Sequence, residues 1–162
     1  AVAMALEEHP LLNSIWLDDE ILIPNEINLG IAVADREGLV VPVIKNADKK
    51  SLREISEARR DIVKRVDEGK LSPDEASGST FTISNLGMYG VQFFTPIINW
   101  PENAIIGVGR ITEKAAVING KILIRSILPL SLSFDHRVID GAPASIFLTR
   151  VKELIEKPAL LA

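Results

Sequence analysis

The chain has 162 residues, which is enough for one domain with a sizeable hydrophobic core. Its 18 basic and 22 acidic side chains are interspersed and leave a net charge of −4, so nucleic-acid binding is not expected. The absence of cysteine excludes disulfides and thiolate metal sites, two histidines far apart argue against a metal centre, and no apolar run approaches the ~20 residues of a membrane span.

The first residues predict a helix. Residues 1–8 have the helical pattern, and His9-Pro10 ends it because the residue before a proline is pushed out of the α region. No Ser, Thr, Asp or Asn stands ahead of this helix to cap it. We therefore expect the domain to be truncated, with its first elements lying before Ala1.

Four β-rich runs follow in two pairs. They are residues 14–17, 20–23, 27–34 and 39–44. Asp18-Asp19 separates the first pair, and the turn from Asp35 to Gly38 separates the second, since such residues favour turns. Two hairpins are therefore predicted.

Capping boxes predict two helices in the middle of the chain. Ser51 and Glu54 form the first, and the helix it opens should stop near Gly69. Its apolar face is expected to hold Leu52, Ile55, Ile62, Val63 and Val66. Ser72 and Glu75 form a second box with a proline between them, which predicts a short helix.

The second half of the sequence alternates strands with loops. The predicted strands are residues 81–83, 104–108, 115–118, 121–124 and 130–134. Residues 88–101 form a long apolar loop, and Asn119-Gly120 is a strong hairpin signal. A helix should begin at Pro143, and its apolar face is expected to hold Ile146, Phe147, Val151, Leu154 and Ile155. An apolar tail, residues 158–162, ends the chain.

This order of elements predicts an α+β domain, with a mixed or antiparallel sheet and helices packed on one face. Neither GxGxxG nor GxxxxGK[ST] is present, so folds that cradle phosphates lose support.

The segment from Asp135 to Gly141 holds the best candidate for reaction chemistry. His136 is a base near neutral pH, and Asp140 follows four residues later. A structural role for His136 is an even alternative on these residues alone, and Asp140 could instead cap the following helix. Ser84, at a strand end beside Asn85, is the best placed hydroxyl to stabilise an oxyanion, although an ordinary turn is the simpler interpretation.

Several segments together resemble one known family. The Asp135 to Ala142 stretch matches the active-site signature of the dihydrolipoamide acyltransferases, the E2 cores of 2-oxoacid dehydrogenase complexes. The family's other signatures resemble residues 38–44, 81–87, 104–109 and 157–161, in the same order. The similarity extends over essentially the whole chain.

The resemblance implies a chloramphenicol-acetyltransferase-like fold that works as a trimer, with active sites between subunits. It implies that His136 is the general base, that Ser84 of the neighbouring subunit binds the oxyanion, and that Asp140 holds the shape of the site. Asn85 and Gly109 match positions near the coenzyme A channel. Residues 1–162 would be the catalytic domain, which moves an acyl group between dihydrolipoamide and coenzyme A.

The resemblance also implies partners. Trimers of the family assemble into a hollow particle through the C-terminal tail, which gives Leu160 and Leu161 a role as contacts between trimers. The lipoyl group would come from a separate lipoyl domain, and the E1 and E3 enzymes would bind through domains that this sequence lacks. The expected location is the cytoplasm, or the mitochondrial matrix in a eukaryote.

Two alternatives compete with this function. An O-acetyltransferase of the same fold would favour a second histidine where Asp135 stands. A scaffold protein without activity would typically lose the histidine, whereas His136, Ser84 and Asp140 are all present. One departure from the family is Ala34, where many relatives carry an aspartate.

Overall fold

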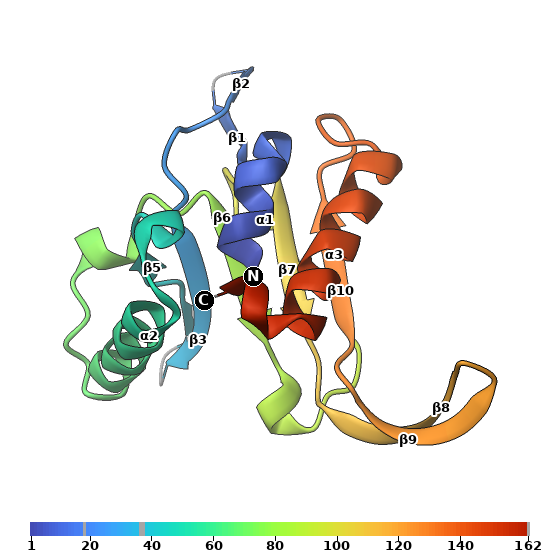
Figure 1. Ribbon diagram of the computed structural model, residues 1–162. Helices are drawn as coiled ribbons and strands as arrows, with labels where there is room; N and C mark the ends of the chain where they lie inside the picture. The colour runs from blue at the N-terminus through green and yellow to red at the C-terminus, as the bar shows by residue number, and fades with distance from the viewer. Residues whose placement is uncertain (18, 36–37, 162) are drawn as a thin grey trace.

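The computed structural model describes residues 1–17, 19–35 and 38–161 (Figure 1). Its helices are α1 (Val2–Glu8), α2 (Leu52–Asp67) and α3 (Gly141–Glu156), and its short 3-10 helices are η1 (Pro10–Asn13), η2 (Ala47–Lys49), η3 (Pro73–Ala76), η4 (Gly87–Tyr89) and η5 (Pro158–Leu161). Its strands are β1 (Ile15–Leu17), β2 (Glu20–Leu22), β3 (Leu29–Asp35), β4 (Gly38–Val40), β5 (Val43–Ile44), β6 (Phe81–Asn85), β7 (Ala104–Val108), β8 (Thr112–Ile118), β9 (Lys121–Ile127) and β10 (Leu130–Phe134).

The main sheet is mixed, as predicted. Its order is β10-β7-β6-β3-β4, and β5 also pairs with β3. The central pairs β3–β6 and β6–β7 are parallel, whereas β10, β4 and β5 pair antiparallel with their neighbours. The pairs β1–β2 and β8–β9 are separate two-stranded ribbons, which extend beyond the two ends of the main sheet (Figure 1).

All three helices share one core with the sheet. Figure 1 shows α1 and α3 lying over the sheet, and α2 beside β3. Leu6 of α1, Ile62 of α2 and Phe147 of α3 belong to the same buried cluster, together with Phe81 and Ile106 of the sheet. The rings of Phe81 and Phe147 lie 5.5 Å apart between centroids. The α+β class with helices on one face is therefore confirmed.

The local signals of the sequence fold as their chemistry predicts. Ser51 Oγ accepts a hydrogen bond from the Glu54 N–H at 3.3 Å, and the Glu54 carboxylate accepts one from the Ser51 N–H at 2.8 Å. Asn119 and Gly120 both have positive φ, which the tight turn between β8 and β9 requires. The turns around Asp18 and around residues 36 and 37 include positions outside the described residues.

Some predicted details are wrong. Helix α3 begins at Gly141 instead of Pro143, and Ile146 and Ile155 are 60% and 41% exposed. The buried residues of α3 are Ala144, Phe147, Val151 and Leu154. Their spacing of three and four residues fills the inner face, so an isoleucine directly before or after one of them is rotated about 100° away from the core.

Two further predictions fail for local reasons. Leu52 is 62% exposed, because it occupies the first turn of α2 while the buried residues Ile62 and Val66 lie in the last turns. The single strand expected over residues 39–44 is divided into β4 and β5. Pro42 lies between them, and a proline has no N–H to donate to a sheet ladder.

Candidate active site

The turn that carries His136 is fixed at its backbone on both sides. Strand β10 ends at Phe134, and the N–H of Asp135 then donates to the carbonyl of Asn103 at 2.8 Å. The carbonyl of Asp135 accepts hydrogen bonds from the N–H groups of Val138 (3.0 Å) and Ile139 (2.9 Å). Ile139 is completely buried, so the turn is anchored to the core. These bonds hold His136 at a defined place at the sheet edge.

Arg137 stabilises the same turn through its side chain. Its Nη2 and Nε atoms donate to the Asp135 carboxylate at 2.5 to 3.1 Å, and its guanidinium lies 4.2 Å from the centroid of the Trp16 ring. The hydrogen bonds from Arg137 lower the pKa of the Asp135 carboxyl, and the same pair raises the pKa of Arg137. Asp135 is therefore ionised and remains bound to Arg137.

His136 projects into solvent with Asp140 beside it. Its side chain is 72% exposed, and its ring lies 5.7 Å from the ring of Phe134. The Nδ1 atom of His136 is 3.8 Å from Oδ1 of Asp140, which is longer than a hydrogen bond. Asp140 occupies the N-cap position of α3, as the capping alternative predicts, but its side chain makes no cap bond. Its carboxylate faces the imidazole instead.

Ser84 lies on the strand at the middle of the sheet. It is the fourth residue of β6, half-buried, and pairs with Ala32 on one side and Gly107 on the other. The adjoining Asn85 is exposed, and its Oδ1 accepts a hydrogen bond from the Gly87 N–H at 2.9 Å. Because β6 is paired on both sides, it holds Ser84 and Asn85 rigidly near its C-terminal end.

Gly109 has a packing role in this chain. A Cβ atom on it would lie only 2.1 Å from the carbonyl oxygen of Gln92. Gly87 similarly faces the Gly109 carbonyl, at 2.5 Å from its own would-be Cβ. Residues 87–92 can therefore approach the end of β7 only because both positions are glycine.

The sheet register separates Ser84 from His136 within one chain. Ser84 pairs with Gly107 near the end of β7, whereas Phe134, two residues before His136, pairs with Ala104 at the start of β7. At a rise of about 3.3 Å per residue, these two pairing positions are about 10 Å apart along the strand, and His136 lies farther out. Figure 1 shows the end of β6 and the loop after β10 at opposite edges of the molecule. One chain thus carries the predicted base and the predicted oxyanion donor in two separate places.

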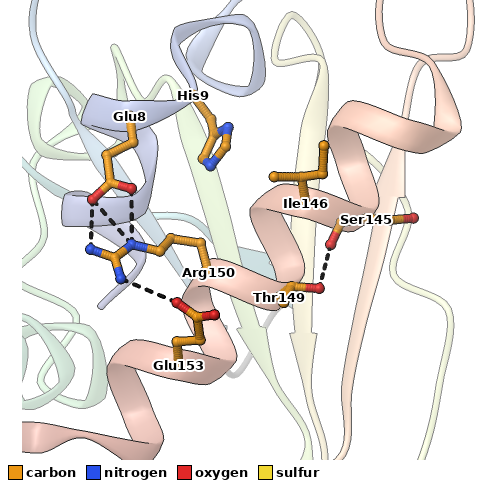
Figure 2. Close-up of a pocket in the computed structure, with 7 residues that line it drawn as sticks. All are labelled: Glu8, His9, Ser145, Ile146, Thr149, Arg150 and Glu153. Atoms are coloured by element: carbon orange, nitrogen blue, oxygen red, sulfur yellow. Dashed lines mark hydrogen bonds and ion pairs between the residues drawn. The ribbon is translucent and has the colours of Figure 1, made fainter.

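The pocket between α1 and α3 contains none of the predicted site residues (Figure 2). It is lined by Glu8, His9, Ser145, Ile146, Thr149, Arg150 and Glu153. Arg150 donates to the carboxylates of Glu8, at 2.8 Å, and Glu153, at 3.3 Å, so these charges are already paired. The His9 ring packs edge-on against Phe147, with centroids 6.0 Å apart, as a structural histidine does.

Two residues at the His136 end of the sheet make contacts that no sequence pattern indicates. Trp16 meets Arg137, and Glu102 is buried at 3% exposure beneath the turn. The sequence gives no signal for either contact: Trp16 reads as an ordinary strand residue, and Pro101-Glu102-Asn103 reads as the end of a loop. Among the described residues, no cluster of histidine, cysteine or carboxylate side chains could hold a metal ion. No helix in that part of the chain is long and apolar enough to cross a membrane.

Comparison with known proteins identifies the family. The sequence model described as 2-oxoacid dehydrogenases acyltransferase (catalytic domain) matches residues 1–162. The chain belongs to this family. The 2-oxoacid dehydrogenase acyltransferase domain has relatives in the pyruvate dehydrogenase complexes of Bacillus subtilis, 48% identical over 99% of the chain, and Rickettsia bellii, 47% identical over 99%. Both are named as the dihydrolipoyllysine-residue acetyltransferase component. The chain spans 37% and 38% of their lengths.

Solved structures of acyltransferase cores have the same fold. A probable dihydrolipoamide acetyltransferase of Listeria monocytogenes superimposes with a TM-score of 0.93 at 41% identity, covering 96% of this chain and 67% of that one. Dihydrolipoamide acetyltransferase of Azotobacter vinelandii, studied for the role of a serine, a histidine and an asparagine in its mechanism, gives 0.90 at 40% identity, covering 98% and 68%. A chloramphenicol acetyltransferase, at 0.58 and 16% identity, covering 94% and 72%, shares the fold alone.

Proposed function

We propose that this catalytic domain transfers an acyl group between the thiol of a dihydrolipoyl arm and the thiol of coenzyme A, at sites shared by neighbouring chains of a homotrimer. The observation that carries the proposal is the separation of Ser84 from His136 along β7. A base and an oxyanion donor at opposite edges of one chain form one site only if a second chain supplies the missing half.

His136 would be the general base. With Nδ1 turned toward Asp140, Nε2 remains to accept the proton of the attacking thiol. Imidazole and thiol have ordinary pKa values near ~6.5 and ~8.5, so the transfer is only mildly uphill. The thiolate then attacks the acyl carbon, the tetrahedral intermediate breaks the old carbon–sulfur bond, and the imidazolium returns the proton to the thiolate that leaves.

Ser84 of the neighbouring chain would donate a hydrogen bond to the oxyanion of the tetrahedral intermediate. Residue spacing supports this assignment. The serine and histidine of the Azotobacter vinelandii enzyme are 52 positions apart, as Ser84 and His136 are, and its asparagine follows the histidine by four positions, as Asp140 does. Asp140 would orient the imidazole from the place where that enzyme has an amide.

Asn85 and Gly109 would lie near the coenzyme A channel. The exposed Asn85 adjoins Ser84 on β6, and Gly109 follows the end of β7. The lipoyl group would arrive on a separate lipoyl domain. The E1 and E3 enzymes would bind elsewhere in the full protein, in the cytoplasm or, in a eukaryote, the mitochondrial matrix. Trimers would assemble into a larger hollow particle through the C-terminal tail.

The relatives favour an acetyl group as the substrate. They act, by name, in pyruvate dehydrogenase complexes and, at 47% identity, in the acetoin cleaving system of Bacillus subtilis. The volume of the acyl-binding pocket would determine which acyl group is preferred. One additional methylene changes the free energy that separates two substrates by only ~1–3 kcal/mol.

The test is acyl transfer from acetyl-, isobutyryl- and succinyl-coenzyme A to dihydrolipoamide, by the full-length protein and its His136→Ala variant. We expect acetyl transfer that falls at least ~10²-fold in the variant. A wild-type assembly that is inactive with every donor would favour the scaffold alternative and leave His136 a structural residue.

A further inference from the structure

Glu102 is a buried acid that the proposed reaction does not use. Its Oε1 atom accepts three hydrogen bonds, from Ser79 Oγ (2.5 Å), Thr82 Oγ1 (2.8 Å) and Asn99 Nδ2 (2.8 Å). Its Oε2 atom is also buried and has no hydrogen-bond partner among the described residues. An isolated buried carboxyl without a cation is costly, so its presence calls for a physical reason.

The backbone on either side of Glu102 holds the His136 turn. The carbonyl of Asn103 accepts the N–H of Asp135 at 2.8 Å, directly before His136. On the other side, the carbonyl of Pro101 accepts the N–H of Trp16 at 2.8 Å. Residues 101–103 thus connect the catalytic turn with the strand whose tryptophan meets Arg137.

The side chain of Glu102 reaches the strand that carries the oxyanion donor. Thr82, one of its three hydrogen-bond donors, lies two residues before Ser84 on β6. Thr82 is itself 1% exposed, so this contact is sealed from water. The Glu102 carboxyl therefore connects the segment that binds the His136 turn to the strand that carries Ser84.

We propose that Glu102 is a positioning residue that sets the His136 turn against the Ser84 strand. The inference rests on the proposed function. His136 and Ser84 of one chain would serve two different active sites of the trimer. Each Glu102 would therefore position His136 in one of these sites and Ser84 in the other. A misplacement of about 1 Å at either half is enough to cost about 10²-fold in rate.

No cation is paired with the Glu102 carboxyl among the described residues. The groups that face the carboxyl are two hydroxyls, the Asn99 amide and the backbone of Thr82. Asp135 is connected to this segment through the Asn103 carbonyl and, by way of Arg137 and Trp16, through the Pro101 carbonyl. Burial raises the pKa of Glu102, against the smaller opposite effect of its hydrogen bonds. The stability that the neutral form contributes is present in acid and is lost as the pH rises through the raised pKa.

The test compares Glu102→Gln and Glu102→Ala in the full-length protein. Glutamine keeps the shape and the accepting oxygen of the neutral acid, whereas alanine removes them. We expect Glu102→Ala to lower kcat for acetyl transfer by about 10²-fold with KM values within about 3-fold, and Glu102→Gln to keep kcat within about 3-fold. Wild-type kcat should fall as the pH rises through the raised pKa of Glu102, in a limb that Glu102→Gln lacks.

Ser51→Ala is the matched control for stability. It removes the capping box of α2, which is remote from the Glu102 contacts, and should lower the unfolding temperature without changing kcat. Full activity in Glu102→Ala would overturn the proposal, as would an equal loss in Glu102→Gln, whose side chain keeps the shape and the accepting oxygen. An inactive wild type would instead overturn the proposed function.

Discussion

The guanidinium of Arg137 lies over the ring of Trp16, 4.2 Å from its centroid, while its nitrogens hold the Asp135 carboxylate. A cation above an aromatic face contributes about 0.5–1 kcal/mol at an exposed site. Trp16→Ala should therefore loosen the turn and lower kcat by about 2- to 5-fold, less than His136→Ala does, while Trp16→Phe keeps most of the activity. Steady-state kinetics of both variants would check this. Equal kcat in Trp16→Ala and wild type would show that the contact between Arg137 and Trp16 does not stabilise the turn.

Mixed assemblies test whether the site spans two chains. His136→Ala and Ser84→Ala homotrimers should each lose at least ~10²-fold in activity. In trimers mixed at equal amounts by unfolding and refolding, one interface in about four pairs an intact His136 with an intact Ser84 of the next chain, so about a quarter of wild-type activity should return. Absence of any recovery would mean that both residues act within one chain.

Gly109→Ala tests the packing at the end of β7. The added methyl group would lie 2.1 Å from the Gln92 carbonyl oxygen, so the backbone of residues 87–92 must shift. We expect a loss of about 1–3 kcal/mol in the free energy of unfolding, as for other overpacked sites. Urea unfolding measures it, with Gly141→Ala as the control, because a Cβ on Gly141 meets open space. Unchanged stability with a raised KM for coenzyme A would point to binding instead.

Glu75 should make the region beside α2 sensitive to acid. A side-chain hydrogen bond from Arg65, followed by bonds from Ser72, lowers the pKa of the Glu75 carboxyl to about 2. A lowered folded pKa means stability that is present above the ordinary carboxyl value and is lost as the pH falls from there toward about 2. Wild type should unfold at a higher temperature than Glu75→Gln at pH 6, with the gap closing below pH 4. A constant gap across thermal scans would contradict this.

The C-terminal tail should control assembly beyond the trimer. Leu160 lies in η5 at 46% exposure, and α3 ends before it at Glu156. Leu161 is half-buried and packs against the core, so Leu160 is the exposed leucine of the tail. Deleting residues 159–162 should leave trimers with acyltransferase activity and remove larger particles, because an exposed leucine favours a partner. Light scattering gives the mass directly. Particles of unchanged mass would exclude the tail as the contact.

Local chemistry could be predicted from the sequence to a useful depth. The Ser51–Glu54 capping box and the Asn119-Gly120 turn were predictable because the bonds that define them span no more than a few residues. The parallel pairing of β3 with β6 was not, since 45 residues separate Asp35 from Phe81 and no local pattern specifies which strands become neighbours. The burial of α3 was predicted only in part, because apolar residues such as Ile146 occur outside its inner face.

The same distinction between local and long-range features applies to the candidate site. His136, Asp140 and Ser84 could be proposed because their motifs are contiguous stretches that resemble a family. Glu102 could not, because a glutamate in a loop is usually exposed, and its burial depends on Ser79, Thr82 and Asn99 folding around it. The opposite placement of Ser84 and His136 likewise follows from strand register, which requires the assembled sheet.

That placement has a consequence for a newly made chain. On the proposed arrangement, a chain that leaves the ribosome alone carries the base of one site and the oxyanion donor of another, and completes neither. It would consume no cellular thioester until it meets its neighbours. Catalytic competence would then depend on quaternary structure, and dilution until trimers dissociate would switch the chemistry off.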